Sequence, residues 1–174
     1  TTASEADGKC VQDAAMGGMM EVESGKVALQ RSSNDQVRQL AQRIVDDHTQ
    51  TNERLQSLAR SKGIEIPIQL DSKHQKEIDK LQKVSAKDFD SKYAALMVSD
   101  HKQDIKAFQH QAERASDPAL KEFATMTLPK LESHLAMAQS AKKTAGRTFE
   151  WLLRRHAGAS RGEVGSDPNQ ISAQ

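Results

Sequence analysis

The chain from residue 35 to residue 62 reads DQVRQLAQRIVDDHTQTNERLQSLARSK, and this stretch decides the fold class. Its apolar side chains, among them Val37 and Ile44, recur at steps of three or four residues, which is the spacing of one face of an α-helix. The polar cluster at 32–35 can cap the start of this helix, and Gly63 ends it. The stretch therefore predicts one long amphipathic helix.

The same periodicity recurs on both sides of this helix. Between Gly63 and Gly146 the chain has no glycine, which argues against a β-rich domain with its many turns. The motif Ser116-Asp117-Pro118 predicts that one helix stops and that the next begins with Asp117 as its N-cap. The other predicted helices cover roughly residues 7–32, 71–84, 88–115 and 118–143.

The lengths of the connections predict the topology. Two or three residues join the first long helix to the second and the third to the fourth, so each pair should form an antiparallel hairpin. The chain from residue 63 to residue 87 is long enough to return along the bundle. We therefore expect an all-α fold, a ferritin-like four-helix bundle with one long crossover between its second and third long helices.

The composition changes at Gly146, which divides the chain into two predicted parts. Residues 1–145 should form the bundle, and residues 146–174 a C-terminal extension. Within the extension, Phe149 to His156 predicts a short amphipathic helix, and the glycine- and serine-containing end predicts a flexible tail.

Charge and composition exclude several kinds of partner. The 174 residues carry 25 Lys+Arg against 24 Asp+Glu, a net charge of +1, which argues against nucleic acid and against anionic membranes. No run of about 18 apolar residues is present, so no transmembrane segment is expected. The single Cys10 cannot form an internal disulfide. Because Thr1 is not an initiator methionine, we expect that a signal peptide has been removed or that the chain begins inside a longer one.

Three of the six histidines fall on apolar helix faces: His48, His101 and His134. A lone histidine on such a face is usually a hydrogen-bonded core residue, so the question is whether the three meet. Counting about 1.5 Å per residue from the two short loops places His48 and Glu21 within about 3 Å in height, and likewise His101 and His134. The crossover then sets His101 level with His48. We therefore expect the four side chains to share one layer of the core.

The first helix offers two acids near this layer, Glu21 and Glu23. They lie about 200° apart around a helix, so only one can face inward. Glu21 borders Gly18, Val22 and Gly25 on the inner face and is the better candidate. The alternative is that Glu21 is a half-exposed helix charge.

A repeated frame supports the histidine layer. The segment Val45-Asp46-Asp47-His48 resembles Val98-Ser99-Asp100-His101. Asp47 and Asp100 are therefore candidates for fixing a histidine ring from outside the layer, with solvated helix charges as the alternative.

Burying three imidazoles and one carboxylate together is unfavourable unless a cation pairs with them. Three histidines and one glutamate suit one divalent transition metal, zinc or iron ahead of copper or manganese. The residues three before the histidines are Val45, Val98 and Leu131 instead of glutamates, which argues against a carboxylate-bridged di-iron centre. The six methionines leave open a copper site with thioether ligands, against the simpler role of core packing.

At these residues the chain resembles a known family, the uncharacterised ferritin-like domain of exported bacterial proteins that is often labelled a predicted outer membrane protein. The resemblance covers roughly residues 7–141 and implies a ferritin-like bundle, a removed signal peptide and a periplasmic or cell-envelope location. It supplies no activity. The matching stretches are MEVESGKVA at 20–28, VDDH at 45–48, 63–67, Phe89-Asp90 with Tyr93, 97–101, and LPKL at 128–131 with His134-Leu135.

Three functions remain open at this point. The first is an exported bundle that binds one metal through Glu21, His48, His101 and His134. The second is a non-catalytic envelope or stress-response module whose histidines fill the core without metal. The third, a ferroxidase or iron store, is weaker because a second set of carboxylates is missing. The sequence names no substrate or reaction, and it leaves open whether the protein is an enzyme and whether it forms a homodimer.

Overall fold

The structure is a computed structural model that describes residues 3–159, with side chains described through residue 146. Within these residues the chain forms helices only, so the predicted all-α class is confirmed. The helices are α1 (Glu5–Arg31), α2 (Asp35–Ser61), α3 (Ser72–Lys83), α4 (Ala86–Arg114) and α5 (Pro118–Ala159).

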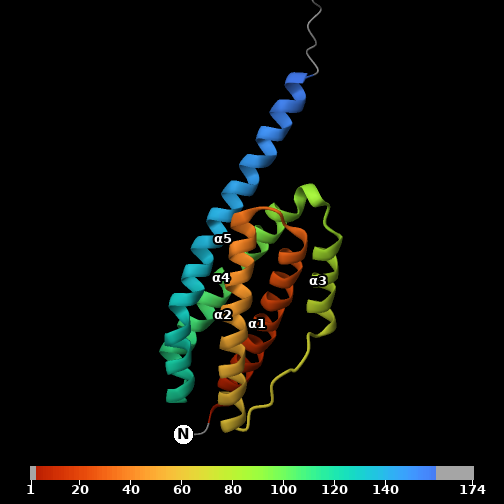
Figure 1. Ribbon diagram of the computed structural model, residues 1–174. Coiled ribbons are helices and arrows are strands. Elements are labelled where there is room, and N and C mark those ends of the chain that lie inside the picture. Colours follow the sequence, from red (N-terminus) through yellow and green to blue (C-terminus); the bar gives the residue numbers. More distant parts are fainter. Residues whose placement is uncertain (1–2, 160–174) are drawn as a thin grey trace, which may run out of the picture.

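The long helices lie side by side in a helical bundle (Figure 1). The most extensive contacts are those of α1 with α2 and of α4 with α5, and further contacts join α2 to α5 and α1 to α4. The shorter α3 packs against α1 and α4. The chain between α2 and α3 runs along the outside of the bundle (Figure 1). None of the described helices has a stretch that is long and apolar enough to cross a bilayer.

Two apolar clusters stabilise the bundle, one toward each end. The larger cluster includes Ile44 and Tyr93, and the smaller one includes Val11 and Leu55. Along α2 the larger cluster ends at Ile44 and the smaller begins at Leu55, so His48 lies between them. The bundle therefore holds a polar layer between two apolar ones.

Side-chain caps set the helix starts close to the predicted positions. Asn34 Oδ1 accepts the backbone N–H groups of Gln36 and Val37 at the start of α2. Asp117 likewise accepts backbone N–H groups in the first turn of α5. Gly63 follows α2 with a φ of 67°, a left-handed conformation that glycine adopts without strain. The observed bounds of α1, α2 and α4 agree with the predicted bounds within two residues at either end.

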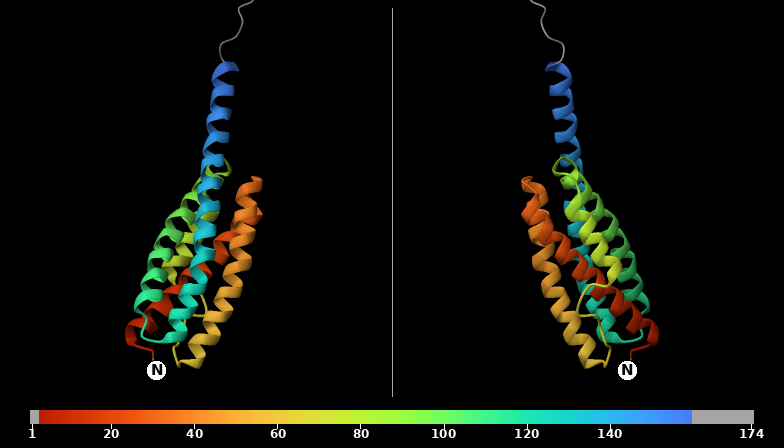
Figure 2. Two further views of the ribbon diagram at one scale, coloured as in Figure 1. Left: turned by 90° about the vertical axis from the view of Figure 1, so that its left-hand side faces the viewer. Right: turned by 90° about the vertical axis from the view of Figure 1, so that its right-hand side faces the viewer.

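The last helix is longer than the sequence predicts. Instead of ending near Lys143 and giving way to a separate short helix at 149–156, α5 continues without interruption to Ala159. A single glycine inside a helix costs only about 1 kcal/mol, so Gly146 alone does not end it. The end of α5 projects beyond the other helices (Figure 2). The division at 145/146 remains a prediction, and residues 160–174 lie outside the described residues.

Two glycines let α1 approach α2 closely. A Cβ atom at Gly25 would lie only 2.7 Å from Cγ2 of Val45, and one at Gly18 would collide with the side-chain amide of Asn52. Glu21 lies between the two glycines on α1. The close approach of the helices therefore brings Glu21 against the face of α2 that carries the buried polar layer.

Arg31, at the end of α1, holds α3 in place. Its guanidinium donates to the carbonyl oxygens of Leu81 at 3.0 Å, Gln82 at 2.8 Å and Val84 at 2.6 Å. It also lies over the ring of Phe89, 4.6 Å from the centroid. The last carbonyls of a helix have no hydrogen-bond donor within the helix. Arg31 supplies donors to the carbonyls at the end of α3.

We expect Arg31→Ala to loosen α3 while the bundle stays folded. Hydrogen bonds to a charged donor are worth about 1.5–3 kcal/mol, so amide hydrogen exchange within α3 should become about tenfold faster or more. Lys26→Ala is the matched control, because Lys26 is also a cation of α1 but pairs, among the described residues, with the half-exposed Glu23 of the same helix. Unchanged exchange in α3 would show that packing alone holds it.

Candidate metal centre

Four buried polar side chains from four helices meet in the polar layer. Glu21 of α1, His48 of α2, His101 of α4 and His134 of α5 are only 2%, 5%, 0% and 1% exposed. The three imidazole ring centroids lie 5.2–5.6 Å from one another. The structure thus brings together all four residues that the helix heights placed on one level.

Glu21 faces the core and Glu23 does not. Oε2 of Glu21 lies 3.0 Å from Nδ1 of His48, and Oε1 lies 3.2 Å from Nδ1 of His101. The side chain of Glu23 is 46% exposed and pairs with Lys26. The alternative of Glu21 as a half-exposed charge is therefore wrong.

The hydrogen-bond partners of His101 and His134 assign the ring protons. Nδ1 of His101 lies 3.0 Å from the carbonyl oxygen of Met97, and Nε2 of His134 lies 2.8 Å from Oδ2 of Asp47. A carbonyl or an ionised carboxylate only accepts, so both of these nitrogens carry the proton of a neutral ring. The remaining nitrogens, Nε2 of His101 and Nδ1 of His134, then both present lone pairs, although they lie 3.2 Å apart. Two facing lone pairs make no hydrogen bond with each other, whereas both could bind a cation placed between the rings.

His48 also has one ring nitrogen beside an acceptor and one ring nitrogen without a partner. Its Nδ1 donates to Oε2 of Glu21 when that group is ionised, and its Nε2 is buried without a hydrogen-bond partner. Each of the three histidines offers one nitrogen within 4.8 Å of those of the other two. The three rings are therefore close enough for one nitrogen of each to bind the same ion.

A proton is a poor occupant of that space at neutral pH. Burial, reinforced by the neighbouring histidines, lowers the pKa of His48 well below its usual value and that of His101 to about 4. Burial also lowers the pKa of His134, although its hydrogen bond to Asp47 opposes the change. The rings are consequently neutral and their lone pairs free.

Asp47 reaches across to another helix. Its Oδ2 accepts from His134 of α5 and also from Nε of Arg43, at 2.7 Å. Burial opposes ionisation, but the hydrogen bonds from His134 and Arg43 prevail and lower the pKa of Asp47. Asp47 therefore has the predicted role of fixing a ring from outside the layer. Asp100, its counterpart in the repeated frame, lines a pocket instead.

That pocket is acidic and has Glu21 among its lining residues. It measures about 780 Å³, lies between α1, α3 and α4, and is also lined by Glu77, Asp100 and Asp104. Burial and then the charge of Asp104 raise the pKa of Glu21 well above its usual value. Burial raises the pKa of Asp104 to about 6, and burial with neighbouring carboxylates raises that of Asp100 to about 7. A cation beside these groups would relieve their repulsion.

Sequence reasoning missed Asp104. It follows His101 by three residues on α4, a spacing that places two side chains on the same helix face. A His-x-x-Asp pattern after a predicted ligand was the signal that could have identified it.

The other histidines and the methionine side chains are not among the four side chains that meet in the polar layer, although His74 lines the acidic pocket with Glu21. His74 pairs with Asp71 on the outer helix, and His110 is exposed. His156 lies outside the residues whose side chains are described. Met20 and Met97 are part of the larger apolar cluster, which favours core packing over a thioether site.

The comparisons with known proteins identify a family and a related fold. The family model described as "Domain of unknown function (DUF4142)" matches residues 1–141. A crystal structure of a DUF305 fragment from Deinococcus radiodurans is similar, with a TM-score of 0.70 over 84% of this chain and 99% of that chain. The identity is 14%, so this likeness shows the fold alone. No curated protein matches the chain significantly.

Proposed function

The chain belongs to the DUF4142 family of domains of unknown function, and we propose that it binds one divalent transition metal in the core of its bundle. One observation carries this proposal: the unprotonated nitrogens of His101 and His134 face each other at 3.2 Å. Nitrogen ligands at about 2.0–2.1 Å from a tetrahedral zinc ion lie about 3.3 Å from each other. The two rings are therefore already spaced as a pair of ligands.

The outer contacts of the rings also suit a metal site. A histidine that binds metal through one nitrogen usually donates the proton on its other nitrogen to a carboxylate or a backbone carbonyl. Here the acceptors are Met97 for His101 and Asp47 for His134. Glu21, when ionised, can accept from Nδ1 of His48. The contacts of His101 and His134 thus favour the tautomers that a metal requires.

Glu21 as the fourth ligand stays a prediction. Its oxygens lie beside Nδ1 of His48 and Nδ1 of His101, while the group of possible ligands consists of the three histidines. Three imidazoles and a carboxylate suit zinc or iron, and also copper or manganese.

We further propose a ferritin-like topology, with the chain from residue 62 to residue 85 as its crossover. The pairing of α1 with α2 and of α4 with α5 supports this, as does the outer path of the connection (Figure 1). Export to the periplasm or cell envelope after loss of a signal peptide rests on the sequence resemblance alone. A homodimer stays a prediction.

Elemental analysis of the untagged protein tests metal binding. We expect nearly one metal ion per chain in the wild type and none in the His48→Ala/His101→Ala variant. The His74→Ala/His110→Ala variant is the control, because it also removes two histidines but leaves the buried layer intact, and it should retain the metal.

The rival function is an envelope or stress-response module whose buried histidines only fill the core. It would leave Nε2 of His48 unpaired and two lone pairs opposed. Absence of metal from the wild type, even after zinc, iron and copper are offered, would favour this rival and overturn the metal centre.

A further inference from the structure

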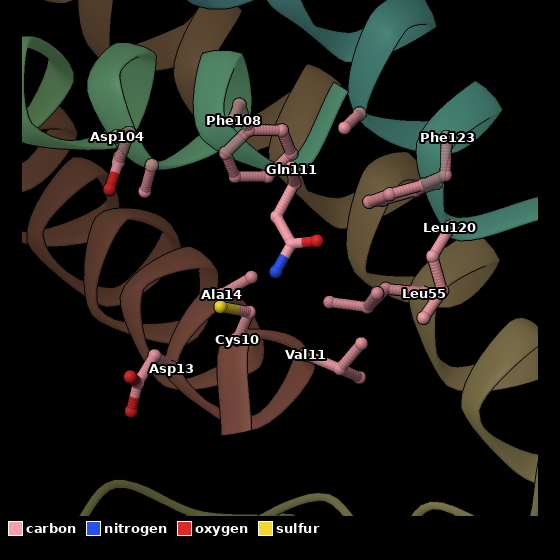
Figure 3. Close-up of a pocket in the computed structure, with 12 residues that line it drawn as sticks. Cys10, Val11, Asp13, Ala14, Leu55, Asp104, Phe108, Gln111, Leu120 and Phe123 are labelled. Carbon is pink, nitrogen blue, oxygen red and sulfur yellow. The ribbon is translucent and has the colours of Figure 1, made fainter. Parts of the chain in front are cut away.

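A second pocket, largely apolar, is shown in Figure 3. It measures about 140 Å³ and is lined by residues of α1, α2, α4 and α5. Figure 3 shows Val11, Leu55 and Leu120 around it. Phe108 and Phe123, whose ring centroids lie 6.1 Å apart, form another part of the wall. The pocket lies between the helix ends that the smaller apolar cluster holds together.

This pocket adjoins the buried histidines. A small cavity of about 20 Å³ is lined by Glu21 and His48, and it shares five lining residues with the apolar pocket. An occupant of the apolar pocket would therefore lie one small cavity away from His48, whose Nε2 has no partner. The shared residues are Ala14, Leu55, Asp104, Phe108 and Phe123.

The volume and the walls define the size of an occupant. An apolar cavity of about 150 Å³ holds benzene, so a pocket of about 140 Å³ is of the size of a single six-membered ring. The paired rings of Phe108 and Phe123 favour a flat apolar body, since aromatic rings attract one another beyond simple burial.

The few polar groups define the charge of an occupant. Asp104 contributes a carboxylate, the carboxylate of Asp13 turns away from the pocket toward Lys9, and Gln111 points its amide into the pocket (Figure 3). The described lining contains no lysine, arginine or histidine. Carboxylate, phosphate and sulfate groups would therefore be repelled by the carboxylates with no cationic side chain of the described lining to offset this, whereas a hydroxyl group can donate to Asp104 or to the Gln111 carbonyl.

We propose that this pocket binds a small neutral molecule with one six-membered apolar ring and a hydroxyl donor, and that it is the substrate pocket of the metal centre. The second part rests on the proposed function, whereas binding itself does not. Occupancy of this pocket would hold the substrate's polar group toward Asp104, on the side of the shared small cavity.

Phenol is the probe, with benzene and benzoate for comparison, on the full chain after metal removal with EDTA. Amide chemical shifts around Gln111 should move saturably with phenol below about 10 mM. Benzene, which lacks the donor, should bind at least threefold more weakly, and benzoate at least tenfold more weakly. Absence of saturable shifts with phenol, or equal binding of benzoate, would overturn the proposal.

Ala14→Leu tests the location, because it places a larger side chain in both the pocket and the small cavity. Phenol binding should weaken at least tenfold. Ala6→Leu makes the same substitution at an exposed position of α1 and should leave binding unchanged. Equal phenol binding by the two variants would overturn the assignment to this pocket.

Cobalt(II) tests separately whether the pocket binds phenol and whether the bound phenol affects the metal centre. If the wild type binds cobalt, phenol should change its visible spectrum, and this change should be absent in Ala14→Leu. Failure to bind any metal overturns the proposed function, while saturable phenol binding to the metal-free chain still supports the pocket. Cobalt binding with a spectrum insensitive to bound phenol overturns the link between the two.

Discussion

Asp47→Asn is expected to lower metal affinity by about 10- to 100-fold, the usual loss when a group that orients a metal-binding histidine is replaced. The carboxylate holds the proton of His134 on Nε2, at 2.8 Å, and so keeps Nδ1 free as a ligand. An asparagine can turn its NH₂ group toward Nε2, which moves the proton to Nδ1 and blocks the lone pair. Titration against a competing chelator with zinc as the metal measures the change.

Asp46→Asn is the matched control. It removes the same charge from the neighbouring residue of α2, but Asp46 is exposed and accepts only from Gln42 on its own helix. The zinc affinity of the Asp46→Asn variant should equal that of the wild type. Equal losses in both variants would show that the overall charge near the site matters and that the tautomer of His134 does not.

The convergence of the four polar residues could be predicted because helix geometry is regular. The rise per residue is constant, and two short loops fix the relative heights of α1 with α2 and of α4 with α5. Glu21 could be chosen over Glu23 for the same reason, since the angle around a helix follows from position in the chain. The heights within each hairpin follow from local rules, whereas placing His101 level with His48 also required the predicted crossover.

The contacts that cross between helices could not be predicted in the same way. The repeated frame makes Asp47 and Asp100 equivalent, yet only Asp47 reaches a histidine, and that histidine is on α5. Which side chain reaches across depends on the rotation and separation of packed helices. The sequence does not specify those quantities locally. Asp104 is a different case, because its spacing from His101 on the same helix is a local signal.

The end of α5 shows why a helix boundary could not be predicted from composition. A composition change at Gly146 indicated a boundary, but helix propensity is a weak preference and a single glycine changes it by only about 1 kcal/mol. No proline follows Gly146 before the helix ends at Ala159. A change in composition therefore did not amount to a stop signal.

Tyr93→Ala is expected to lower the free energy of unfolding by about 3–5 kcal/mol, the range for removal of a large aromatic side chain from a core. Tyr93 is fully buried and stacks on Phe89, with ring planes only 3° apart. The substitution would leave a cavity in the larger apolar cluster. Urea unfolding with EDTA present measures the change without any contribution from bound metal.

Tyr93→Phe separates the ring from its hydroxyl group. The hydroxyl is buried without a hydrogen-bond partner, so its removal loses no bond and ends an unfavourable desolvation. Stability should therefore stay the same or rise. A loss above about 1 kcal/mol would mean that the hydroxyl has a partner in solution, since that is the usual worth of a hydrogen bond. Burial and then the charge of Glu21 raise the pKa of Tyr93, so Glu21 is the candidate, and the core would then be coupled to the metal centre.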